Sequence, residues 1–248
     1  MPRKRRKPSP KKEPKKKGVT GERFRKSPAF AGSRLAANEF GKASQCAVLL
    51  RHEFAQLLEL PRQNDLHRRL SQKIGRLMRK RRMSGARVAG LNAQPWEELT
   101  GFEFNENGTL SSLLGLLPDK VSTAFSPATG TIDIEVTSFS LHARLSDGKA
   151  GSHGRVIACA AAIDFTKNKT AGDYSATDYF SFEDPPGRDR PNAVVRFSLQ
   201  LPAPVKHPVF VALGITSHNI EKGNYSMTGN QRYKGLALVY VRPVASGA

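Results

Sequence analysis

The sequence lacks the short motifs that most often mark catalytic or metal-binding sites. Two cysteines and six scattered histidines occur in 248 residues. There is no Cys-x-x-Cys, His-Glu-x-x-His, Gly-x-Ser-x-Gly, phosphate-binding loop or dinucleotide fingerprint. We therefore predict a protein that is not an enzyme and has no metal and no cofactor.

Long apolar runs are also absent. No stretch approaches the roughly 18 apolar residues of a membrane-spanning helix, and the charged first 17 residues are not followed by the apolar segment of a secretory signal. We expect no membrane span and a cytoplasmic location.

Cys46 and Cys159 each lie in an apolar run, which favours buried, reduced thiols.

Acidic residues are scarce in one part of the chain only. Residues 1–95 contain 26 Lys/Arg and 6 Asp/Glu, whereas residues 96–248 contain 14 and 15. The net charge of +19 therefore comes from the first part. Such segregation is typical of a surface that binds a polyanion.

Residues 1–17 carry ten Lys/Arg, one Glu and several prolines, with no apolar residue after Met1. A segment of this kind cannot bury enough surface to offset its ordering entropy, so we predict a disordered basic arm. Its function would be to neutralise phosphates or to act as a targeting signal, and the alternative is a solubilising tail. The candidate contacts in the arm are Lys4, Arg5, Arg6, Lys7, Lys11, Lys12, Lys15, Lys16 and Lys17.

Two helices are predicted next, over residues 35–60 and 64–83, separated at Pro61. Apolar residues recur at steps of three and four. They are Phe40, Ala43, Ala47, Leu50, Phe54 and Leu57 in the first helix, and Leu66, Leu70, Ile74 and Leu77 in the second. We expect the stripes to pack against each other or against the rest of the protein, as a helical hairpin.

The second helix is strongly basic. Its Arg69, Lys73, Arg76 and Lys80 follow one another at steps of four, three and four, so they form a ridge that could follow a phosphate backbone. Arg79 and Arg82 add to this charge. The alternative interpretation is a solvated helix face without a partner.

Several short strings resemble an uncharacterised family of hypothetical bacterial proteins. They are Ser27-Pro28-Ala29-Phe30-Ala31 with Arg34, Asn38-Glu39-Phe40-Gly41-Lys42-Ala43, Leu49-Leu50-Arg51, Ala86-Arg87 and Glu98-Leu99-Thr100-Gly101-Phe102-Glu103-Phe104-Asn105. The resemblance implies a helical segment followed by a β-rich half. It implies no activity and no functional residue.

From Phe102 onward the apolar period changes to two, which predicts strands. Asn107-Gly108 predicts a tight hairpin turn with a strand returning from Leu110. Further strands are expected over residues 121–125, 131–139, 155–165, 193–201, 209–216 and 236–241. Together they predict an antiparallel, immunoglobulin-like β-sandwich. Trp96 is expected to seal its junction with the helices.

Two long loops are expected over residues 166–191 and 217–235, with Tyr174, Tyr179 and Tyr225 among their aromatic residues. Aromatic side chains beside carboxylates could bind a sugar or a peptide, or the carboxylates could hold Ca²⁺. Ordinary loop packing is the alternative.

The sequence therefore predicts an α+β protein in three parts: a disordered basic arm over residues 1–17, a basic helical hairpin with its linker over 18–95, and a β-sandwich over 96–248. The predicted function is non-enzymatic binding of nucleic acid, DNA or RNA, or of another polyanion, with little sequence specificity. A structural subunit of a homo-oligomer or larger assembly and a ligand-binding sandwich are the alternatives.

Overall fold

The computed structural model describes residues 20–58, 64–83, 90–115, 120–137, 150–183 and 194–243. The chain divides into two compact units, residues 1–38 and 39–248. The predicted arm, residues 1–17, lies outside the described residues.

The first unit contains a short helix, α1 (Gly21–Lys26), a 3₁₀ turn, η1 (Pro28–Phe30), and the start of α2 (Ala31–Phe54). Thr20 caps α1 by accepting a hydrogen bond from the Arg23 amide through its hydroxyl. Arg34 Nη1 donates to the carbonyls of Phe24 at 2.7 Å and Ser27 at 2.8 Å. These bonds fix the chain as it enters α2.

In the second unit, α2 continues to Phe54, followed by η2 (Ala55–Leu58) and α3 (Asn64–Met83). The bounds of α3 agree with the prediction. The buried stripe of α2 begins at Ala43, because the Phe40 side chain, predicted to belong to it, is 66% exposed. Ser44 and His67 join the two helices by a 3.0 Å hydrogen bond.

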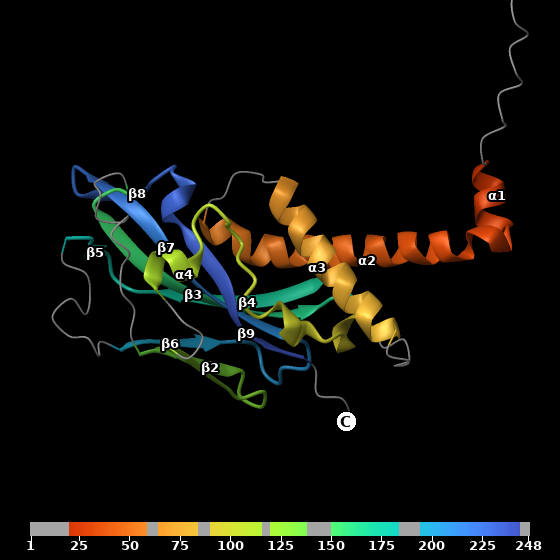
Figure 1. The fold of residues 1–248 in the computed structure, drawn as a ribbon. Coiled ribbons are helices and arrows are strands. Elements are labelled where there is room, and N and C mark those ends of the chain that lie inside the picture. The colour runs from red at the N-terminus through yellow and green to blue at the C-terminus, as the bar shows by residue number, and fades with distance from the viewer. Residues whose placement is uncertain are drawn as a thin grey trace, which may run out of the picture. The chain divides into compact units, whose positions relative to one another are not determined.

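The strands form two antiparallel sheets (Figure 1). The small sheet has the order β1-β2-β6, and the large sheet has the order β4-β3-β7-β8, with β5 also paired to β3 and β9 to β7. The bounds are β1 Val121–Phe125, β2 Thr131–Val136, β3 His153–Asp164, β4 Lys169–Ala176, β5 Phe180–Ser181, β6 Val195–Gln200, β7 Val209–Glu221, β8 Asn224–Met227 and β9 Gly235–Arg242. The predicted combination of helices with antiparallel sheets is confirmed.

The central strands of the large sheet, β3 and β7, are buried on both faces along most of their length. Alternate residues of β3, such as Ile157 and Cys159, join a cluster with the apolar stripes of α2 and α3, while Val156 and Ala158 join a second cluster with the small sheet. Helices and small sheet therefore cover opposite faces of the large sheet. This explains why β3 and β7 are nearly continuous apolar runs.

Trp96, in η4 (Trp96–Leu99), lies in the cluster between the helices and the large sheet. Its ring stacks on Phe165 with centroids 4.4 Å apart and meets the edge of Phe210 at 5.8 Å. Its Nε1 donates to the Leu91 carbonyl at 3.1 Å. The predicted sealing role is confirmed.

The predicted hairpin at residues 105–108 is wrong, because Leu110–Leu114 forms α4 instead of a returning strand. Asn105 is fully buried, and its Nδ2 donates to the carbonyls of Gln231 and Lys234, each at 2.7 Å. A Cβ at Gly108 would lie 2.7 Å from the Lys234 carbonyl oxygen. Asn105 and Gly108 therefore hold this turn close to residues 231–234, which precede β9.

The two predicted loops contain strands. The first includes β4 and β5, and the second includes the end of β7 and all of β8. Tight turns with positive φ at Asn168 and at Lys222-Gly223 return the chain onto its neighbour. Polar residues occupy much of β4, which among the described strands pairs only with β3, so no apolar pattern marked it as a strand.

Both cysteines are buried and free, as predicted. Burial raises the pKa of each thiol to about 12, so neither is a reactive thiolate at neutral pH.

None of the helices within the described ranges combines the length and apolarity needed to cross a bilayer.

Candidate functional site

The basic helix α3 carries eight Lys/Arg and one acidic residue, Asp65. Its apolar residues Leu66, Leu70, Ile74 and Leu77 are buried against α2 and the large sheet. The opposite side is exposed and includes Arg68, Arg76, Arg79, Lys80 and Arg82. We call these five residues the outward face of α3.

Arg69, the first residue of the predicted ridge, is a structural residue. Its side chain is only 16% exposed. Nη1 donates to the Glu103 carbonyl at 2.9 Å, and Nη2 donates to the Phe104 carbonyl at 3.2 Å. Asp65 and Glu106 neutralise its charge at 3.2 and 3.3 Å. Arg69 is therefore unavailable to an external anion.

Lys73 is half-buried, and its Nζ lies 5.8 Å from the centre of the Phe102 ring. Two further cations are exposed but paired: Lys80 with Glu98 at 2.9 Å and Arg82 with Glu39 at 2.8 Å. Arg68 pairs with Asp65 and, through that hydrogen bond above all, lowers the pKa of the carboxyl. Such exposed ion pairs contribute little stability. A polyanion can therefore replace the carboxylate as the partner of the cation.

Arg76 and Arg79 are exposed, and neither has an ion pair with any other described residue. They are the two members of the outward face whose charge is uncompensated locally. The predicted ridge is thus divided: its first half is enclosed by residues 102–106, and its second half is open. The predicted arm contacts Lys4 to Lys17 fall outside the described residues.

A second cluster lies on the large sheet, where β3, β7 and β8 run side by side. Tyr179 stacks on Tyr225 with ring centroids 3.8 Å apart and planes at 3°. The edge of His218 meets Tyr179 at 4.8 Å, and the Arg155 guanidinium lies 5.1 Å from the same ring. The structure therefore brings together one tyrosine from each predicted loop.

The sequence did not indicate the other members of this cluster. His153 and His218 are register partners of β3 and β7, but each lies two residues outside the strand predicted for it. Tyr174, the third predicted loop aromatic, stands on β4 and is 67% exposed. No ring contact joins it to the cluster among the described residues.

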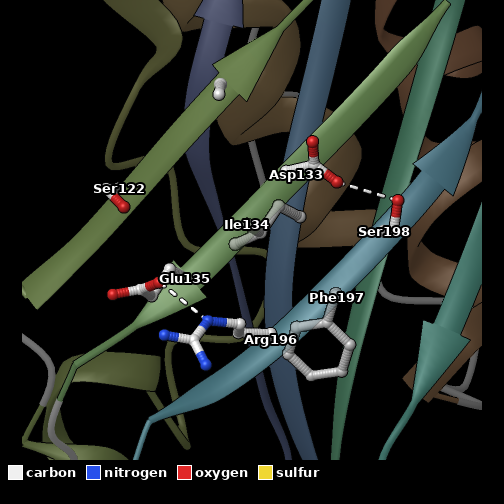
Figure 2. A pocket seen from close by; sticks show the side chains of 8 residues that line it. Ser122, Asp133, Ile134, Glu135, Arg196, Phe197 and Ser198 are labelled. Carbon is white, nitrogen blue, oxygen red and sulfur yellow. Dashed lines mark hydrogen bonds and ion pairs between the residues drawn. The ribbon is translucent and has the colours of Figure 1, made fainter.

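A hollow of about 480 Å³ lies on the outer face of the small sheet (Figure 2). Small side chains of β1, Ser122 and Ala124, leave space beside β2 and β6. The polar groups are already paired: Ser198 Oγ donates to Asp133 at 2.8 Å, and Arg196 pairs with Glu135 at 2.9 Å. The polar side chains that line the hollow therefore bind one another across β2 and β6.

Within the ranges that the structure describes, no three His, Cys, Asp or Glu side chains gather closely enough to hold a metal ion. Comparisons with protein-family models, with curated proteins and with solved structures find no match to this chain. The resemblance to an uncharacterised bacterial family stays a prediction.

Proposed function

We propose that this protein binds nucleic acid, or a comparable polyanion, through the outward face of α3 together with residues 1–17. The observation that carries the proposal is the pair Arg76 and Arg79, exposed on a helix of eight cations and one acid without ion-pair partners among the described residues. Guanidinium groups are well suited to phosphate oxygens.

Helix stabilisation does not account for the whole charge pattern. Cations in the last turn, Lys80 to Arg82, favour the negative end of the helix dipole. Arg68 and Arg76 lie outside that turn, where the dipole effect has fallen off. Phosphate contacts carry no sequence information, so we expect little sequence preference.

The test is a salt titration of binding to a labelled 20-base-pair duplex, followed by fluorescence anisotropy. Each phosphate contact contributes about 0.9 to the slope of log affinity against log salt. Replacing Arg76 and Arg79 by Ala should lower that slope by about 1.8, and deleting residues 1–17 should lower it further. The matched control replaces Lys167 and Lys206, two exposed lysines of the β region, and should leave the slope nearly unchanged.

Absence of binding at low salt, or equal slopes in the two double variants, would overturn the proposal. Purification with and without nuclease gives an independent readout, because co-purified nucleic acid raises the absorbance at 260 nm. Light scattering on both samples reports the oligomeric mass, and a salt-stable oligomer in the nuclease-treated sample would favour an assembly subunit.

We further propose that the two sheets form an immunoglobulin-like sandwich. Two antiparallel sheets packed through a shared apolar cluster support this class.

A further inference from the structure

The aromatic cluster on the large sheet is an ordered column of three planar groups. The Arg155 guanidinium lies over Tyr179, 5.1 Å from the ring centre, and Tyr179 in turn lies flat against Tyr225 at 3.8 Å. Tyr225 stands on β8, which pairs only with β7 among the described strands (Figure 1). The column therefore ends at an edge of the sheet.

Each member of the column contacts either the backbone or a neighbouring histidine. Arg155 Nε donates to the Thr177 carbonyl at 2.8 Å. His218, which is buried, bonds Thr216 Oγ1 at 2.9 Å and presents an edge to Tyr179. His153 meets Tyr225 at 72° with ring centroids 5.5 Å apart. The rings are thus positioned before any ligand arrives.

The column is not part of the hydrophobic core. Neither Tyr179 nor Tyr225 belongs to either apolar cluster, and Tyr225 remains 42% exposed although Tyr179 covers one of its ring faces. The neighbouring Ile220, the register partner of Tyr225, is also exposed. An aromatic stack with an exposed terminal ring is a surface on which another planar group can lie.

We infer that Tyr225 is a stacking platform for an unpaired nucleobase, and that the ligand of this protein is single-stranded nucleic acid. The inference rests on the proposed function, since it names the kind of nucleic acid that the cationic helix would hold. In a duplex the bases are stacked within the helix, so only a single strand can place a base on the ring.

The groups around the column favour a base over a sugar. Arg155 and His218 contact Tyr179, and His153 contacts Tyr225. The guanidinium of Arg155 over Tyr179 places a positive charge at one end of the column, which favours an anionic strand over a neutral sugar.

The experiment measures binding of a labelled 12-nucleotide oligouridylate to the full chain by anisotropy. Tyr225→Ala should weaken binding by about 5- to 150-fold without changing the salt slope, because the ring carries no charge. Tyr225→Phe should bind like wild type. Tyr174→Ala removes an exposed tyrosine outside the column and should also bind like wild type, and duplex binding should not respond to any of the three.

A second measurement is independent of the cationic helix. Uridine monophosphate, titrated at millimolar concentration, should shift the ring NMR signals of Tyr225 and leave those of Tyr240 unchanged. Tyr225→Leu, which keeps apolar bulk without a ring, replaces the alanine variant if that variant does not fold.

The outcomes separate the two proposals. If duplex and oligouridylate bind with steep salt slopes but Tyr225→Ala and Tyr225→Leu change nothing, the platform is refuted and the charged interface stands. If neither nucleic acid binds at low salt, the charged interface is refuted, and absence of a Tyr225 shift with the mononucleotide then refutes the platform as well.

Discussion

Arg69 and Arg76 stand seven residues apart on α3, so their side chains leave the helix in nearly the same direction. Their surroundings nevertheless differ. Residues 102–106 cover Arg69 with two carbonyls, the Phe102 ring and the Glu106 carboxylate, while Arg76 is exposed. The comparison teaches that helical spacing alone does not make an arginine available to a ligand.

The largest effect is expected from Trp96→Ala, because Trp96 anchors the chain that leads into residues 102–106. The side chain has no exposed area and packs on two phenylalanines. Its loss should lower the free energy of unfolding by about 3–5 kcal/mol, measured by urea denaturation with circular dichroism. Trp96→Phe should lower the free energy of unfolding by less. Equal decreases in the two variants would show that the size of the ring does not stabilise this segment.

The second prediction concerns a buried histidine, His218, whose protonation depends on its surroundings. Burial lowers the pKa of His218 to about 4, with Arg155, Lys234 and His153 adding to the effect. The unfolded chain, with a histidine pKa near 6.5, therefore binds more protons between pH 6.5 and pH 4. Stability should be full above pH 6.5 and fall by roughly 3 kcal/mol towards pH 4.

The measurement is the free energy of unfolding from pH 7 to pH 4 for wild type and His218→Gln. The glutamine variant should lose less stability over that interval. Burial and Arg51 also lower the pKa of His67, which contributes in the same direction, so only the difference between the two proteins reports on His218. Parallel pH curves would contradict the prediction.

Arg69→Ala should lower the free energy of unfolding by about 2–3 kcal/mol, because two partly buried carbonyls lose their charged donor. Urea denaturation is the measurement. Arg69→Lys keeps the charge without the planar guanidinium group. Its free energy of unfolding should lie between those of Arg69→Ala and wild type. If Arg69→Ala were as stable as Arg76→Ala, Arg69 would have no structural role that Arg76 lacks.

The smallest effect on stability is expected for Arg76→Ala combined with Arg79→Ala. Both side chains are exposed and without ion pairs among the described residues, so the free energy of unfolding should stay within about 0.5 kcal/mol of wild type. The same protein should show the reduced salt slope described above. A clear loss of stability would mean that these arginines, like Arg69, are structural.

Much of the secondary structure followed from local pattern. The ends of α3 at Asn64 and Met83 and the whole of β1 agree with the prediction, because apolar period and chain-breaking residues coincide there. β4 and β8 were predicted as loops because both are largely polar. Among the described strands, each pairs along one side only. Edge strands of this kind are stabilised by pairing with a buried neighbour.

The candidate sites were predicted less completely. The charge of α3 was evident from the sequence, but the enclosure of Arg69 depends on a segment more than thirty residues away. The stacking of Tyr179 on Tyr225 depends on the pairing of β3 with β5 and β7, and of β7 with β8. No local sequence pattern predicts either contact.

The sequence by itself determined where helices and buried strands form and which third of the chain holds the excess positive charge, because these follow from side-chain chemistry at each position. Only the tertiary structure decided which cations are exposed and which aromatic rings meet. The physical reason is that solvation and contact depend on residues far apart in the chain, which folding alone brings together.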